Sequence, residues 1–188
     1  MKTTRQFRLL AALLLTTLTA PLMAQDIKNA LFRIAPAEYG TLAEKSILTL
    51  GKFDFAAWGA MLADDVEYDF PDGDQNTRTK LKGKTAVLTW WKNWQTTSGT
   101  KAMTMTDFNT FPLDVYGTTK GGAAKGFYAF TYFTNKQTIS GKPVSTRMNF
   151  AIHFNAGKKI DRYITYYDRT AVIKALGRNL LEKATAKK

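Results

Sequence analysis

The second half of the chain contains four long extended segments, near residues 103–116, 127–134, 144–154 and 160–167. In the third of these, Val144, Phe150 and Phe154 share one strand face, while Arg147 and His153 share the other. The connections between the segments are short and contain glycine, which is typical of β-hairpins. A run of hairpins predicts antiparallel strands in one sheet, and this feature restricts the fold more than any other.

Helical patterns surround this run of strands. Residues 38–50, 54–62 and 83–96 precede it, and residues 170–182 follow it. Asp54 stands where a side chain can cap the second helix, and a short alternating segment at 66–70 separates the second helix from the third. Helices followed by strands indicate an α+β fold. We expect three N-terminal helices to cover a curved antiparallel sheet, with a short C-terminal helix and a pocket at the open end.

The composition excludes several kinds of active site. The 188 residues include no cysteine and one histidine, so the chain cannot use thiolate nucleophiles, cysteine-bound metals or paired imidazoles. We therefore expect no metal site and no cofactor. The formal charge is +12, but the basic residues are scattered and six of the fifteen acidic residues lie between positions 64 and 74. This distribution does not favour nucleic-acid binding.

The first 24 residues resemble a secretory signal peptide. Lys2, Arg5 and Arg8 form a basic start, residues 9–19 are largely apolar, and small residues precede position 25. The apolar run is about half of the roughly 20 residues that a membrane-spanning helix needs. We expect cleavage near Ala24, a periplasmic or secreted protein without a membrane span after cleavage, and a single domain from 25 to 188.

Three stretches together resemble a known superfamily. Phe53–Trp58 leads into Ala63–Pro71, Leu81–Lys84 precedes an aromatic helix, and Asn155–Lys158 leads to Tyr166–Asp168. These features are similar to the SnoaL-like branch of the nuclear-transport-factor-2-like superfamily. The resemblance implies a cone-shaped α+β fold with a deep pocket. It also implies a homodimer that buries the outward sheet face, where we expect His153. Members act as isomerases, cyclases, dehydratases, epoxide hydrolases or non-catalytic modules.

The catalytic residues of the superfamily's ketosteroid isomerases do not transfer to this chain. When Pro71 is aligned with the proline after the catalytic aspartate, Phe70 takes the position of the base, and Asp69 falls on the opposite strand face. Ser46 takes the position of the oxyanion-hole tyrosine, and Phe150 that of its acidic partner. Steroid isomerisation is therefore not the expected activity.

Two interpretations of a C-terminal cluster remain open. Arg162, Tyr166 and Asp168 share one strand parity, and the resemblance turns that face toward the pocket. Asp168 could then act as a general acid or base, with Tyr166 as a hydrogen-bond donor, in a cyclase, isomerase or lyase. Alternatively, Asp168 caps the final helix and pairs with a nearby arginine.

Aromatic residues suggest a ligand site. Large rings provide apolar area, and the polar tips of tryptophan and tyrosine can orient a ligand. The expected pocket residues are Trp58, Tyr68, Phe70, Trp90, Trp94 and Phe150. The sequence therefore favours an exported protein that binds a small, largely apolar molecule. An enzyme that uses Arg162, Tyr166 and Asp168, or a non-catalytic dimerisation module, is the alternative.

Overall fold

The structure is a computed structural model that describes residues 31–74, 76–118, 121 and 123–182. Its four helices in this part of the chain are α2 (Glu38–Gly51), α3 (Phe55–Met61), α4 (Lys84–Ser98) and α5 (Thr170–Leu176). The strands are β1 (Phe32–Ile34), β2 (Leu62–Asp69), β3 (Lys80–Lys82), β4 (Met103–Val115), β5 (Gly126–Ile139), β6 (Lys142–Phe154) and β7 (Ile160–Tyr167). The predicted signal peptide lies outside the described residues.

All seven of these strands join one curved, unclosed sheet in the order β1-β4-β5-β6-β7-β2-β3. The predicted antiparallel pairing of the four long strands is confirmed. The sheet is mixed because β2 lies parallel to β7, next to it. Two short strands that the sequence did not predict extend the sheet, namely β1 at one edge and β3 at the other.

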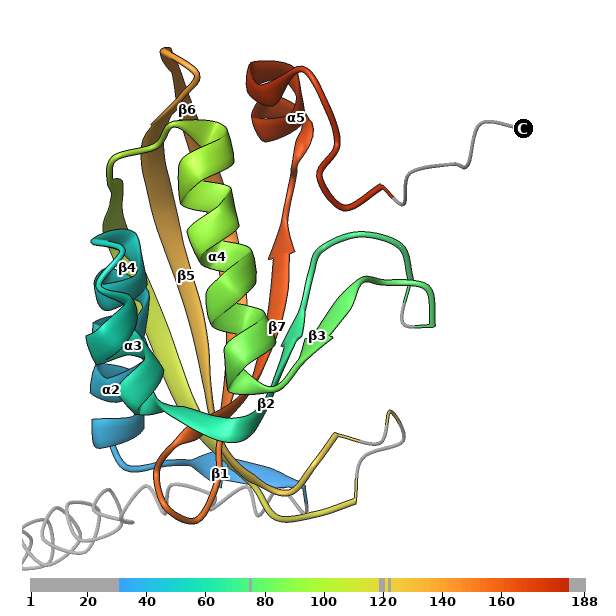
Figure 1. Cartoon of the computed structure of the whole chain (residues 1–188). Coiled ribbons are helices and arrows are strands. Elements are labelled where there is room, and N and C mark those ends of the chain that lie inside the picture. The colour runs from blue at the N-terminus through green and yellow to red at the C-terminus, as the bar shows by residue number, and fades with distance from the viewer. Residues whose placement is uncertain (1–30, 75, 119–120, 122, 183–188) are drawn as a thin grey trace, which may run out of the picture.

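The helices α2, α3 and α4 cover one face of the sheet, as Figure 1 shows. Strand β4 contains an irregularity between Thr106 and Asn109, where Asp107 has a φ of 56°. Such a bulge bends a strand and increases its twist. The predicted α+β fold, with three N-terminal helices on a curved sheet and a short C-terminal helix, is confirmed.

Local signals explain where the helices begin and end. The Asp54 carboxylate accepts a hydrogen bond from the Ala57 N–H at 3.0 Å, which is the predicted cap of α3. Helix α3 ends at Met61, earlier than the pattern suggested, because β2 already begins at Leu62. Helix α5 ends at Leu176 rather than near 182, because Gly177 adopts a left-handed conformation with a φ of 73°.

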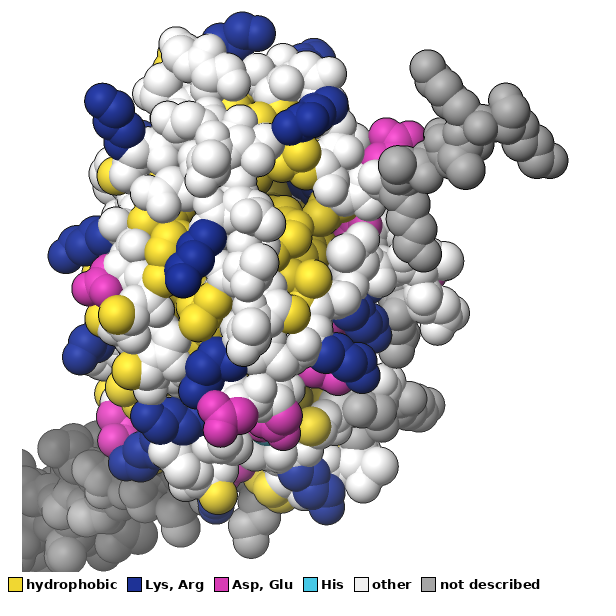
Figure 2. Space-filling view, in the orientation of Figure 1, with side chains coloured by type: hydrophobic (Ala, Val, Ile, Leu, Met, Phe, Trp, Pro, Cys, Tyr) yellow, Lys and Arg dark blue, Asp and Glu magenta, His cyan; other side chains and the backbone are white. Residues whose placement is uncertain are grey.

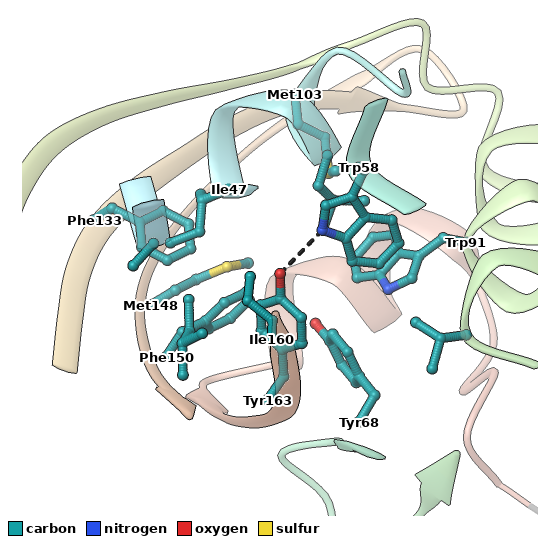
Figure 3. Packing of buried hydrophobic residues seen from close by; sticks show 14 of the residues in the cluster. Ile47, Trp58, Tyr68, Trp91, Met103, Phe133, Met148, Phe150, Ile160 and Tyr163 are labelled. Carbon is teal, nitrogen blue, oxygen red and sulfur yellow. Dashed lines mark hydrogen bonds between the residues drawn. The ribbon is translucent and has the colours of Figure 1, made fainter. Parts of the chain in front are cut away.

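The core lies between the helices and the concave face of the sheet. Trp58, Tyr68, Phe150 and Tyr163 pack there with exposed fractions of 3% or less (Figure 3). The Trp58 indole donates to Tyr163 Oη at 3.0 Å, and Tyr163 donates to Ser46 Oγ at 3.1 Å. A buried hydrogen-bonded chain therefore ties α2, α3 and β7 together.

None of the helices in the described ranges is long and apolar enough to cross a membrane.

Candidate functional site

A cavity lies at the open end of the sheet, between α4, α5 and the ends of the central strands. We call it the concave pocket. Its rings come from Phe70, from Trp90, Trp91 and Trp94 of α4, and from Tyr167. Figure 2 shows hydrophobic side chains reaching the surface beside α4, toward α5. The cavity volume is about 40 Å³, which holds no more than a few water molecules.

The spacing of the tryptophans along α4 builds one wall of this pocket. Residues four apart lie on the same helix face, and the rings of Trp90 and Trp94 stack with centroids 5.9 Å apart. Phe70, directly after β2, contacts Trp90 at a centroid distance of 4.4 Å. The wall is therefore flat, aromatic and supported from the neighbouring strand.

Polar atoms without hydrogen bonds lie in the same lining. Within the described residues, the buried Nε1 atoms of Trp91 and Trp94 have no acceptor. Asn135 Oδ1 and Gln137 Oε1 of β5 have no donor there, although both side chains are buried. Each such group costs about 1–3 kcal/mol when it is buried without a partner. Residues of the pocket lining therefore carry two buried donors and two buried acceptors without a partner among the described residues, on an apolar background.

Helix α5 and the residues that follow it cover the concave pocket. Ile173 and Leu176 of α5 line it, and so does Leu180 beyond the helix. The covering segment is held by hydrogen bonds from the Arg169 guanidinium and from the Leu181 N–H to Asn179 Oδ1. An organic ligand needs more than the present volume, so this segment must move for one to enter.

The titratable groups of the pocket are poorly suited to proton transfer. Burial raises the pKa of Tyr167 to about 12, so its phenol stays protonated at neutral pH. Arg169 and Arg178 also line the cavity. Among the described lining residues none is an aspartate, a glutamate or a histidine. The lining is therefore mainly apolar and aromatic, with two arginines.

The expected pocket residues divide into two groups. Phe70, Trp90 and Trp94 line the concave pocket. Trp58, Tyr68 and Phe150 instead pack in the core, at exposed fractions of 0%, 0% and 3%. The cavity is displaced from the expected position because these three rings fill the interior below it.

The expected convergence of the C-terminal cluster on the concave pocket is wrong. Tyr163 and Tyr167 face the helices, so Arg162 and Tyr166 lie on the opposite, outer face of the sheet. Burial acts to lower the pKa of Arg162, but the hydrogen bond and charge of Asp69 outweigh this effect, so the net change is upward. The catalytic role suggested for Arg162 and Tyr166 stays a prediction.

Asp168 lies beyond the end of β7, is exposed, and accepts a hydrogen bond from the Thr170 N–H at 2.8 Å. Hydrogen bonds from Thr170 lower the pKa of Asp168, so its carboxylate is ionised at neutral pH. This contact agrees with one part of the alternative interpretation, in which Asp168 supports the start of α5. Arg169 rather than Asp168 occupies the N-cap position, and among the described residues no salt bridge joins Asp168 to an arginine.

His153 lies on the outer sheet face as expected, but its side chain is largely buried within the chain itself. Its side chain is 10% exposed, and it makes a hydrogen bond between Nδ1 and Asp161 Oδ1 at 2.5 Å and a contact from Nε2 to the Lys125 carbonyl. The sequence analysis also missed Asn135 and Gln137. Both share the strand parity of buried Phe133, so inward-facing amides were a detectable signal.

The described architecture matches solved structures. A candidate isomerase from Bacillus subtilis is 17% identical with a TM-score of 0.58, over 77% of this chain and 97% of that one. A candidate polyketide cyclase from Xanthomonas campestris pv. campestris is 15% identical with a TM-score of 0.55, over 76% of this chain and 99% of that one. The chain has the fold of the SnoaL-like and nuclear-transport-factor-2-like proteins.

The sequence itself gives no closer assignment. Neither the protein-family profiles nor the curated proteins include a match. At these identities the likeness shows the fold alone, and fold does not determine activity.

Proposed function

We propose that this protein binds a small, largely apolar molecule in the concave pocket and carries out no reaction on it. The observation that carries the proposal is the set of unused polar atoms from Trp91, Trp94, Asn135 and Gln137 in an aromatic lining. Buried polar groups are nearly always paired in folded proteins, so a cluster of unpaired ones marks a place for a partner molecule. The lack of a lining carboxylate or histidine among the described residues supports binding over catalysis.

The lining also suggests the chemistry of the ligand. Stacked indoles favour a flat ring system, and the indole N–H groups need acceptors such as a carbonyl or ether oxygen. The amide oxygens of Asn135 and Gln137 need donors such as a hydroxyl group. A flat aromatic or polycyclic molecule with hydroxyl or carbonyl groups meets these requirements.

Isothermal titration with 1-naphthol and with naphthalene tests this site. The two probes share a flat ring system, but only 1-naphthol has a hydroxyl that can donate to Gln137. Gln137→Leu should weaken 1-naphthol binding by about 2- to 10-fold, the effect of one lost hydrogen bond, and leave naphthalene binding unchanged. Gln95→Leu is the matched control, because Gln95 lies on α4 but not in the lining.

A second substitution tests the position of the entrance. Leu180→Arg places a charge beside the covered cavity and should weaken the binding of both probes. Leu48→Arg is its control, since Leu48 is already 41% exposed on α2. Native mass spectrometry of the purified protein looks for a bound natural ligand. Failure of both probes to bind, with no co-purifying molecule, would contradict the proposal.

We also propose that the protein is exported after cleavage near Ala24. This proposal rests on the basic start and the short apolar run of residues 1–24. Mass spectrometry of the N-terminus in the periplasmic and secreted fractions tests it. A chain that retains Met1 and stays in the cytoplasm would contradict it.

A further proposal is that two copies pair through the part of the outer sheet face around Phe111 and Tyr132, on β4 and β5. Phe111 and Tyr132 support it, because they are 56% and 44% exposed and their rings are 6.5 Å apart on neighbouring strands β4 and β5. Analytical ultracentrifugation should give the mass of a dimer for the unaltered chain and that of a monomer for Phe111→Lys. A monomeric unaltered chain would contradict pairing.

A further inference from the structure

A second pocket lies on the outer face of the sheet, on the side away from the helices. We call it the outer pocket. Its floor is formed by Phe130, Ala151 and Ile164, which are directly paired across β5, β6 and β7. Ala151 is the small residue between two larger ones, so the floor is hollow at its centre. The cavity is about 450 Å³, within the range of about 300–1,000 Å³ typical of small-molecule sites.

A buried ion pair lies at one side of this floor. Arg162 Nη2 donates to Asp69 Oδ2 at 2.7 Å, and Asp69 is only 2% exposed. The parallel pairing of β2 with β7 brings these residues together although they are 93 positions apart. In the part of the chain that the structure describes, Asp69 Oδ1 and Arg162 Nε have no hydrogen-bond partner. The pair is therefore incomplete on both sides, and both residues line the cavity.

Two further cations stand at the rim. The Arg78 guanidinium lies 4.9 Å from the centroid of the Tyr166 ring, and Arg78 Nε is a third buried atom without a partner in the described ranges. Lys80 lies beside it at the start of β3. The Tyr166 ring, in a residue that is 51% exposed, therefore lies next to the Arg78 guanidinium and also lines the cavity.

The lining carries an excess of positive charge. The lining contains three cationic side chains, those of Arg78, Lys80 and Arg162, and one carboxylate, that of Asp69. The neighbouring acids are engaged elsewhere: Glu67 pairs with Lys82 at 2.8 Å, and Asp72 accepts from Thr79. Over the described residues no acid pairs with Arg78 or Lys80. A cavity with unpaired guanidinium and ammonium groups attracts an anion, and Arg is suited to binding a carboxylate.

We infer that the outer pocket is a second binding site, for a small organic carboxylate with a flat apolar body. The carboxylate lies among Arg78, Lys80 and Arg162, and the apolar body rests on Ala151 and Ile164. This site is independent of the concave pocket, which has different lining residues and lies on the other face of the sheet.

Titration of the full chain with 2-naphthoate and with the neutral isostere 2-naphthamide tests the inference. We expect 2-naphthoate to bind at least about tenfold more tightly, because only the anion makes charge-assisted hydrogen bonds. The difference should shrink as salt is raised, since the rim cations are partly exposed. Equal affinity for the two probes would overturn the inference.

Two variants locate the bound anion. Arg78→Gln should weaken 2-naphthoate binding by roughly tenfold, and Ala151→Leu should abolish it by filling the hollow floor. Arg147→Gln is the control, since Arg147 lies on β6 with the same outward parity but outside the pocket. Thermal unfolding shows whether each variant is folded. If Ala151→Leu is unfolded, Ala151→Val replaces it as the filling variant, with weaker binding expected.

Binding of the anion elsewhere, or covering of the outer pocket by a second copy, would give different results. If Leu180→Arg abolishes 2-naphthoate binding and Arg78→Gln does not, the anion binds in the concave pocket and the inference fails. If Ala151→Leu leaves 2-naphthoate binding intact but changes the mass in ultracentrifugation, a second copy covers the outer pocket and the inference also fails. Loss of binding in Arg78→Gln with the mass unchanged supports it.

Discussion

Tyr68 and Tyr163 give a direct test of the buried hydrogen-bonded chain in the core. Both side chains are 0% exposed, and their ring centroids are 5.2 Å apart. Tyr163 Oη accepts from Trp58 and donates to Ser46. Tyr68 Oη has no partner among the described residues. Replacing either tyrosine by phenylalanine removes one phenol oxygen from the core, but we expect opposite changes in the free energy of unfolding.

The magnitudes follow from which groups lose a partner. Tyr163→Phe leaves the indole N–H of fully buried Trp58 without an acceptor, while Ser46 keeps its hydrogen bond to the Ala43 carbonyl. An orphaned buried donor costs about 1–3 kcal/mol, so the free energy of unfolding should fall by about 2 kcal/mol. Tyr68→Phe removes a hydroxyl that is already unpaired, so the free energy of unfolding should stay constant or rise by up to about 1 kcal/mol.

Urea denaturation followed by far-UV circular dichroism measures both changes without relying on the tryptophan signal beside the mutated sites. Equal m-values in the two variants would show that their free energies of unfolding can be compared directly. A loss of stability in Tyr68→Phe as large as that in Tyr163→Phe would refute the reasoning. It would mean that Tyr68 Oη has a partner, such as a buried water, which the contacts of the described residues do not include.

Three other predictions concern pH, capping and the proposed acid. Burial raises the pKa of Tyr163 to about 12, against about 10 in the unfolded chain. Between these pH values only the unfolded chain loses the Tyr163 proton, so this residue should lower the free energy of unfolding by about 1.4 kcal/mol per pH unit as the pH rises. Tyr163→Phe should reduce the slope of the free energy of unfolding against pH, measured by urea denaturation at each pH. Asp54→Ala should lower the free energy of unfolding by about 1 kcal/mol by removing the α3 cap, while Asp65→Ala, at an exposed position of β2, should not. Asp168→Asn should leave 1-naphthol affinity unchanged within about twofold in calorimetry, and a larger loss would return Asp168 to the site.

Much of the concave pocket could be predicted from residue spacing. Helical spacing put Trp90 and Trp94 on one face, and the proline after Phe70 ended its strand beside them. The amides of Asn135 and Gln137 were missed because polar residues in a strand are normally assigned to its exposed face. Their shared strand parity with buried Phe133 indicates that both side chains face the core.

The orientation of residues 160–167 could not be predicted, because both strand faces are similar in character. One face carries Tyr163 and Tyr167, and the other carries Ile164 and Tyr166. A two-residue period separates two sets of side chains but does not say which set meets the helices. The register with β6, in which Tyr163 lies opposite buried Ile152, decides it.

The sequence by itself determined the helices, the long strands and their order, but not the short edge strands β1 and β3. Alternation, glycine turns and caps such as Asp54 act over a few residues, so they can be read from neighbours in the chain. Only the tertiary structure decided which faces enclose a cavity and which distant charges meet. Asp69 and Arg162 form a pair because β2 joins β7 in parallel, a contact between segments far apart in the sequence. Contacts of this kind depend on how the whole sheet closes over its helices, and no local pattern encodes them.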